Sequence, residues 1–159
     1  MTNGGLPWRP SVRVRASAVV LHRGHVLLQR VERDKFWALP GGGVEVGETS
    51  AQTVQREVQE ETGEAMNLVR LVCITENFFE LYEQRWHQID FAYLMQLQSG
   101  SALADVNRTH MGDENGQPLI QRWFPVGELH TLEYPLKPGF WLEHLPNLPE
   151  QTLHLTWRT

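Results

Sequence analysis

Three carboxylates in the stretch "REVQEETG" have the spacing of a reactive site. Glu57, Glu60 and Glu61 stand at positions i, i+3 and i+4, so on an α-helix they share one face. Gly63 is typical of a helix end, so these acids fall in the last turns, where the helix dipole disfavours negative charge. Such a cluster is either a solvated acidic surface or a site for a hard divalent cation, which prefers oxygen ligands.

A glycine-rich loop directly before this helix favours the metal site. The stretch "PGGGVEVGE" at 40–48 brings backbone without side chains close to the carboxylates. Its carbonyls can approach a metal, and its N–H groups can approach a phosphate. Because Mg²⁺ commonly bridges carboxylates and substrate phosphates, the two features together indicate phosphate chemistry at a metal.

The helix that carries the acids is predicted over residues 50–62. Thr49 and Gln52 have the spacing of a capping box at its start, and Gly63 ends it. Apolar residues at helical spacing form the stripe that packs it, namely Ala51, Val54 and Val58. One side of the helix therefore packs inward while the other presents carboxylates.

Strands make up most of the remaining pattern. We predict strands at 12–22, 25–31, 67–79, 85–98 and 118–124, short helices at 125–132 and 136–145, and an edge strand at 152–159. Residues 80–84 are predicted to be a turn, and 99–117 a long polar loop of the kind that is usually functional or mobile. Strands and helices mix, so the fold class is α/β or α+β around a mixed sheet. Residues 1–11 are expected to be a loose lead-in to a single domain at 12–159.

Composition narrows the class of protein. The net charge is -5 and no cluster of Lys and Arg is present, which disfavours nucleic-acid binding. Cys73 is the one cysteine and lies in an apolar run, so we expect a buried thiol and a reducing, cytoplasmic location. No stretch approaches the roughly 20 apolar residues of a membrane span, so we expect no membrane partner.

Residues 42–64 resemble the Nudix box. Its pattern is Gly, five residues, Glu, seven residues, then Arg-Glu-aliphatic-any-Glu-Glu-any-Gly-aliphatic. The matching positions are Gly42, Glu48, Arg56, Glu57, Val58, Glu60, Glu61 and Gly63. The last position departs from the pattern, since it holds Glu64 in place of an aliphatic residue. Ala65 or Met66 is expected to supply the missing packing.

The resemblance implies an α/β/α sandwich with a central mixed β-sheet, and an enzyme that cleaves a phosphoanhydride bond. Its substrate would be a nucleoside diphosphate linked to a further group, or a nucleoside triphosphate. Carried onto this sequence, the metal ligands for Mg²⁺ or Mn²⁺ would be Glu57, Glu60, Glu61 and the Gly42 carbonyl. Arg56 would pair with Glu48 and hold the loop against the helix.

The sequence does not identify a single general base. Hydrolysis needs a carboxylate that takes a proton from water, and Glu60 or Glu61 could do so. In this family the base can also come from a distant loop. Glu114 is then the first external candidate and Asp113 the second.

The rest of the substrate is expected to meet aromatic side chains, which stack well on nucleobases. Phe79 and Tyr82 are the candidates, because they lie nearest the turn of the second hairpin. Tyr82 also falls about where dinucleoside polyphosphate hydrolases of the family carry a tyrosine. That activity is one alternative, and a non-catalytic Nudix-fold nucleotide-binding regulatory module is another. The expected partner is a small nucleotide, and a homodimer is left open.

Overall fold

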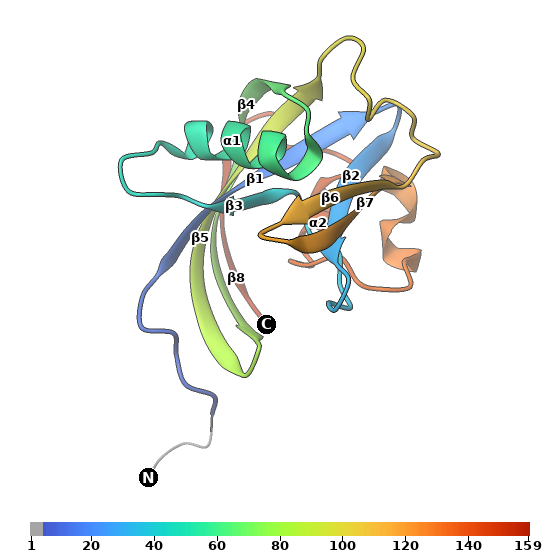
Figure 1. Ribbon diagram of the computed structural model, residues 1–159. Helices are drawn as coiled ribbons and strands as arrows, with labels where there is room; N and C mark the ends of the chain where they lie inside the picture. The colour runs from blue at the N-terminus through green and yellow to red at the C-terminus, as the bar shows by residue number, and fades with distance from the viewer. Residues whose placement is uncertain (1–4) are drawn as a thin grey trace.

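The computed structural model describes residues 5–159 (Figure 1). Its elements are β1 (Arg13–His22), β2 (His25–Val31), β3 (Gly41–Gly43), α1 (Ser50–Thr62), β4 (Met66–Leu81), β5 (Gln84–Leu97), β6 (His110–Glu114), β7 (Gln117–Pro125), the 3₁₀ helix η1 (Val126–Thr131), α2 (Trp141–His144) and β8 (Leu153–Arg158). The strands pair in the order β6-β7-β2-β1-β5-β4-β8, and β3 pairs separately with β1. Parallel and antiparallel pairs both occur, so the predicted mixed sheet is confirmed.

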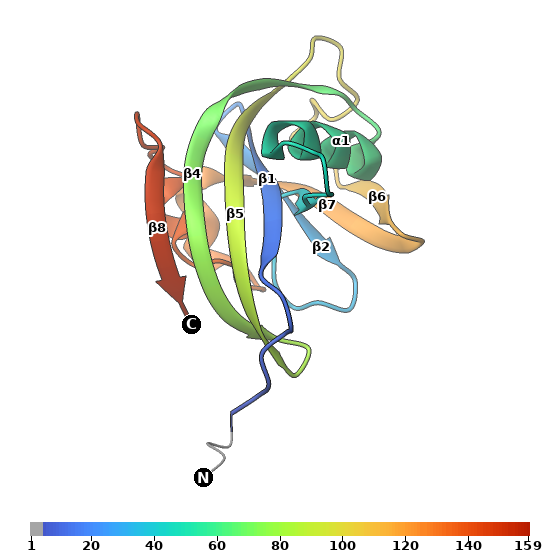
Figure 2. The same cartoon turned by 90° about the vertical axis from the view of Figure 1, so that its left-hand side faces the viewer.

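The sheet divides at β1 into two wings. Along most of its length β1 pairs in parallel with β5, whereas it meets β2 only at Leu21↔Val26 and His22↔His25. The long wing therefore contains β1, β5, β4 and β8, which lie side by side in Figure 2. The short wing contains β2, β7 and β6. Residues of both wings line one cavity, so the wings diverge from this short junction and leave a wedge between them.

Helices cover the sheet on two sides. The predicted capping box at Thr49 and Gln52 is present, and Gly63 ends α1 in the left-handed region with φ 76°. Val54 and Val58 are fully buried in one core under α1. A second core lies on the other side of the sheet, where α2 buries Trp141. The molecule thus has the expected three layers.

The second hairpin turns more tightly than predicted. β4 continues to Leu81 and β5 begins at Gln84, so only Tyr82 and Glu83 form the turn, in place of the predicted residues 80–84. Both turn residues have positive φ, 51° and 60°. Two-residue hairpin turns of this kind usually carry Asn or Gly, and the absence of that signal explains the difference.

The prediction of a loop over 99–117 is wrong in its second half. His110–Glu114 form β6, which pairs antiparallel with β7 through a turn at Asn115 and Gly116. The dipeptide Asn-Gly is a strong hairpin signal, but β6 is short, mostly polar and at the sheet edge. Its sequence therefore has little of the hydrophobic alternation that marks a strand.

The described part of the lead-in is not loose. The Arg85 N–H donates to the Pro7 carbonyl at 2.8 Å, and the Arg9 N–H donates to the Arg85 carbonyl at 2.9 Å. Trp8 packs its ring edge-on against Phe78, with 6.3 Å between centroids. One parallel bridge between Trp8 and Arg85 therefore ties this segment to the start of β5, while residues 1–4 lie outside the described part of the chain.

Three smaller expectations are confirmed. Cys73 is a free, buried thiol, and Met66 is buried in the core beneath α1, where it supplies the packing that Glu64 lacks. The Glu64 carboxylate instead accepts a hydrogen bond from the Ala102 N–H at 2.7 Å. β8 stands at the sheet edge beside β4. Within residues 5–159, no helix has the length and apolar character needed to cross a membrane.

Candidate active site

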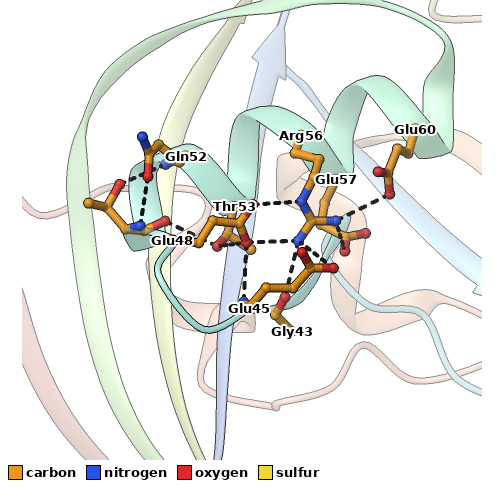
Figure 3. Close-up of polar contacts among 9 residues, drawn as sticks. Gly43, Glu45, Glu48, Gln52, Thr53, Arg56, Glu57 and Glu60 are labelled. Atoms are coloured by element: carbon orange, nitrogen blue, oxygen red, sulfur yellow. Dashed lines mark hydrogen bonds and ion pairs between the residues drawn. The ribbon is translucent and has the colours of Figure 1, made fainter.

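Arg56 braces the glycine-rich loop against α1 (Figure 3). Its Nε donates to Glu48 Oε2 at 2.7 Å, and its Nη2 donates to Glu48 Oε1 at 2.9 Å. A further bond runs from Nη2 to the Gly43 carbonyl at 3.3 Å. Hydrogen bonds from Arg56 and then from Thr53 lower the pKa of Glu48 to about 2. The pairing of Arg56 with Glu48 that the resemblance implied is therefore present.

The same guanidinium also contacts two of the acids on α1. Arg56 Nη1 donates to Glu57 Oε1 at 2.9 Å and to Glu60 Oε2 at 3.3 Å. The bonds to Glu48, and then those to Glu57, raise the pKa of Arg56. The Glu60 side chain is 59% exposed and that of Glu57 only 17%. Glu60 thus reaches towards solvent, and Glu57 points towards the loop.

Glu61 is the buried acid of the cluster. Only 2% of the residue is exposed, and its Oε1 accepts a hydrogen bond from the Gly41 N–H at 3.3 Å. Its Oε2 has no partner among the described residues. Burial raises the pKa of Glu61 well above its ordinary value; the nearby Gln29 amide and the charge of Arg15 oppose this, and Glu57 adds to it. A buried carboxylate with a free oxygen calls for a cation or a proton.

Two glycines let the loop lie this close to the helix. A Cβ on Gly42 would overlap the Glu57 carboxylate, and a Cβ on Gly41 would overlap the Ala16 carbonyl on β1. The loop therefore lies between β1 and the acidic face of α1 only because side chains are absent at these positions. This close approach places the Gly42 peptide beside Glu57.

These groups fit a hard divalent cation by their chemistry. The candidate ligands are all oxygens, Glu61 has an oxygen without a partner, and Gly42 leaves room beside Glu57. In the present side-chain conformations, however, no three acidic or imidazole groups within residues 5–159 converge on one point. Glu57 and Glu60 are engaged by Arg56 and would have to turn away from it, while Glu48 would keep Arg56 paired.

Glu114 lies on a hairpin that packs against the end of α1. Gln121 of β7 donates to the Glu61 carbonyl at 2.9 Å, and a Cβ on Gly112 of β6 would overlap that carbonyl. Glu114 follows at the end of β6 and lines the cavity between the wings. Asp113 instead accepts from the Gly116 N–H at 3.1 Å and is engaged in the turn.

A cavity of about 630 Å³ occupies the wedge between the wings. Gly41 belongs to its wall, so the cavity reaches the loop that contacts Glu61. Five basic residues line it, namely Arg13, Arg15, Arg30, Arg33 and Lys137. Five aromatic residues also line it, namely Phe36, Phe79, Tyr82, Trp86 and Trp157. A hollow with cationic and aromatic walls is suited to a flat ligand that carries negative charge.

Both predicted substrate-binding aromatics lie in this cavity. The rings of Phe79 and Trp86 are almost parallel, with planes 9° apart and centroids 5.8 Å apart. The Tyr82 hydroxyl lies 2.8 Å from both carboxylate oxygens of Asp34, and the Arg33 guanidinium stands 4.7 Å from the Tyr82 ring centroid. Tyr82 therefore links the hairpin turn to the loop after β2 at the wall of the cavity.

Sequence reasoning missed the polar residues on the long wing. Asn77, Gln88 and Asp90 are nearly buried, and the Ser17 hydroxyl donates to Asp90 Oδ2 at 2.7 Å. Burial raises the pKa of Asp90, while Arg15 and then the Ser17 hydrogen bond oppose it. The signal was available in "RWHQIDF", where polar residues take the buried positions of an alternating strand.

Comparisons with known proteins agree with this arrangement. The model of the NUDIX domain family matches residues 12–144. An RNA pyrophosphohydrolase of Edwardsiella ictaluri is 26% identical over 139 residues, which cover 77% of this chain and 73% of that protein. One from Serratia proteamaculans is 28% identical over 133 residues, with 77% and 74% covered.

Solved structures show the same fold. A MutT NUDIX hydrolase from Burkholderia pseudomallei superposes with a TM-score of 0.63 at 26% identity, and covers 84% of this chain and 97% of its own. A UDP-X diphosphatase superposes with a TM-score of 0.62 at 20% identity, covering 92% of this chain and 68% of its own, which supports the fold alone. The chain belongs to the Nudix family. It is a hydrolase that acts on pyrophosphate bonds.

Proposed function

We propose that this protein hydrolyses a phosphoanhydride bond in a small nucleotide with the help of Mg²⁺ or Mn²⁺. The substrate would be a nucleoside diphosphate linked to a further group, or a nucleoside triphosphate. One observation carries the proposal: the Gly41 N–H contacts Glu61 at 3.3 Å, and Gly41 also belongs to the cavity wall. The acidic face of α1 therefore adjoins a hollow lined by basic and aromatic side chains.

The acidic face would hold the cation. Glu57, Glu60, Glu61 and the Gly42 carbonyl are the ligands we propose. The cation supplies positive charge to the phosphate oxygens and makes water a stronger acid. Glu57 and Glu60 must exchange Arg56 for the cation, which is feasible because two bonds from Glu48 keep the guanidinium paired.

A carboxylate must also accept a proton from the attacking water. Glu60 and Glu61 belong to the acidic face itself, and Glu114 belongs to the cavity wall on the β6–β7 hairpin. All three are proposed as candidate bases. Arg15 lines the same cavity from β1, and we assign it to orienting the phosphate chain.

A second candidate substrate is the 5′-triphosphorylated end of an RNA. Proteins named RNA pyrophosphohydrolase are among the relatives, at 26–28% identity. A second hollow of about 250 Å³ shares Phe79, Glu80 and Thr159 with the main cavity. Its walls alternate aromatic and basic groups, for example Arg85, whose guanidinium stands 4.5 Å from the Trp8 ring centroid. Such surfaces suit successive unstacked bases.

A substrate panel tests both candidates. It should contain nucleoside triphosphates, nucleoside diphosphate sugars, a dinucleoside polyphosphate and a 5′-triphosphorylated oligoribonucleotide, each with Mg²⁺ and with a chelator. We expect metal-dependent release of phosphate or pyrophosphate from a small nucleotide. Faster turnover of the oligoribonucleotide would favour the second candidate, and metal-bound protein that turns over none of them would leave a binding module.

We also propose a cytoplasmic location. Cys73 is a free thiol, and a soluble nucleotide would be met in a reducing compartment.

A further inference from the structure

The long wing presents one continuous row of side chains to the cavity. Strand register places Arg13 beside Gln88, Gln88 opposite Asn77, and Asn77 beside Trp157. Residues that are paired in register point to the same face of a sheet. All four side chains line the cavity, so this row, which we call the floor row, runs across β1, β5, β4 and β8.

The two amides of the floor row are buried, and two of the row's polar atoms have no hydrogen-bond partner among the described residues. Asn77 and Gln88 are each only 5% exposed. Asn77 Oδ1 and Trp157 Nε1, on neighbouring strands, have no hydrogen-bond partner among the described residues. Gln121 shows what a purely structural buried amide does in this protein, since it donates to the Glu61 carbonyl at 2.9 Å. An acceptor and a donor left open side by side in a cavity indicate a ligand that completes them.

The rows on either side of the floor row set the direction of that ligand. One row outwards, Phe79 pairs with Trp86 and their rings are parallel within 9°. Inwards, Arg15 comes next on β1, followed by Ser17, which pairs with Gly41. Four residues along a strand span roughly 13 Å. A pentose and a short phosphate chain bridge such a distance, so a ligand with its phosphates at Gly41 would have its head group at the floor row.

The floor row also has the functional groups that read purines. A guanidinium pairs with the O6 and N7 acceptors of guanine, and a side-chain amide pairs with N6 and N7 of adenine. Arg13, Gln88 and Asn77 supply one guanidinium and two amides in line. Pyrimidines lack N7, and the aromatic pair in the next row offers a stacking surface for either class of base.

We propose that Asn77 and Gln88, with Arg13, form a recognition site for a purine base, which would make the protein selective for purine nucleotides. This inference rests on the proposed function, because it places the phosphate chain at the Gly41 and Glu61 end of the cavity. It adds the part of the substrate that the acidic face of α1 does not contact.

The first test uses unmodified protein and changes the ligand. Calorimetric titrations in EDTA should compare AMP and GMP with CMP and UMP, so that binding is measured without turnover. We expect purine monophosphates to bind at least about tenfold tighter, and 7-deazapurine monophosphates, which lack N7, to lose about tenfold; tenfold corresponds to about 1.4 kcal/mol. Equal affinity for purines and pyrimidines, or full affinity for the 7-deaza ligands, would overturn the proposal.

The second test changes the floor row. Asn77→Leu and Gln88→Met keep the size of each side chain but remove its hydrogen bonds. We expect each to lower AMP or GMP affinity about tenfold, with CMP and inorganic pyrophosphate affinities unchanged. Gln96→Met is the matched control, because Gln96 lies on the same strand and is exposed. Retained purine preference in both variants would refute the assignment. Thermal melts identify any variant that fails to fold. If a variant does not fold, the binding of 7-deaza ligands to the unmodified protein decides whether the proposal stands.

The two proposals fail in different ways. Purine-selective binding without hydrolysis of any nucleotide would leave the recognition site in place and remove the proposed activity. Hydrolysis of purine and pyrimidine nucleotides at equal kcat/KM would keep the activity and remove the recognition site.

Discussion

The two ends of the cavity are held by different forces. At the end near α1, the Glu57 and Glu60 carboxylates are positioned by ion pairs with Arg56. At the floor row, Asn77 and Gln88 are positioned by the backbone register of β4 and β5. Ion pairs between side chains can exchange partners at small cost, whereas a strand ladder cannot shift without moving every side chain on it. The acidic end can therefore adapt to a cation, while the floor row is preformed.

This difference predicts that turnover and substrate binding depend on different groups of residues. Changes at the acidic end should lower kcat, because we assign its groups to the reacting phosphate. Changes at the floor row and at the aromatic pair beside it should raise KM, because we assign these groups to the distant part of the substrate.

The largest effect is expected from Glu61→Gln. The change removes a buried negative charge whose free oxygen we assign to the cation, so kcat should fall by roughly 10²–10⁴-fold. Steady-state phosphate release measures it. Glu64→Gln is the matched control, since Glu64 is the neighbouring acid outside the cluster and contacts Ala102. If kcat were unchanged in both Glu61→Gln and Glu60→Gln, neither acid would belong to the mechanism.

Gly42→Ala is expected to have the next largest effect. The new Cβ would displace the Glu57 carboxylate, and a misplaced catalytic group can cost roughly 10²-fold in rate. The melting temperature should change little, because the displaced atoms are the end of a flexible side chain. Gly127→Ala, where a Cβ would meet no neighbouring atom, is the control. A large loss of stability with normal kcat would show that Gly42 serves only the fold.

Phe79→Leu tests the aromatic pair beside the floor row. Stacking of a base on an aromatic ring is worth about 1–3 kcal/mol, so KM should rise roughly tenfold or more while kcat stays constant. Full kinetic curves for one nucleotide measure both constants. Phe91→Leu provides the comparison, because Phe91 lies on β5 outside the cavity lining. A fall in kcat alone would contradict the division between the two ends.

The smallest effect is expected from Asp90→Asn, and it concerns stability. Burial raises the pKa of Asp90 above its unfolded value, so the folded state binds more protons between the two pKa values. Stability from this group therefore falls as pH rises through that window. At neutral pH the variant should have a higher melting temperature than the native protein. The difference between the two melting temperatures should become smaller as the pH is lowered. Thermal melts in EDTA from acid to neutral pH measure this, and a pH-independent difference would argue against a buried, titrating Asp90.

The acidic end could be predicted from the sequence because it is local. The loop, the capping box and the carboxylates all lie within one continuous segment, and helix geometry alone places the acids on one face. The pairing of Arg56 with Glu48, which the resemblance to the Nudix box implied, lies within the same short segment. Most strands were likewise predicted, because their hydrophobic patterns are local.

The floor row could not be predicted in the same way. Its residues come from four strands, and only the register of their pairing brings them together. In the sequence, Asn77 and Gln88 each look like an isolated polar residue in a strand, and nothing indicates which residues of other strands lie beside them. Wrongly predicted segments have a similar cause, since β6 and the turn at Tyr82 depend on tertiary contacts that override weak local preferences.

The parallel pairing of β1 with β5 has a consequence for the order of folding. Ser17 and Asp90, joined by one hydrogen bond, are 73 residues apart in the chain, so the intervening segment must be closed into a loop first. Contacts of such long range form slowly, whereas a capped helix of 13 residues needs only its neighbours. We therefore expect α1 to become protected from amide hydrogen exchange early in refolding, and the amides between β1 and β5 late. The chain would then complete its acidic face before it has a cavity in which to use it.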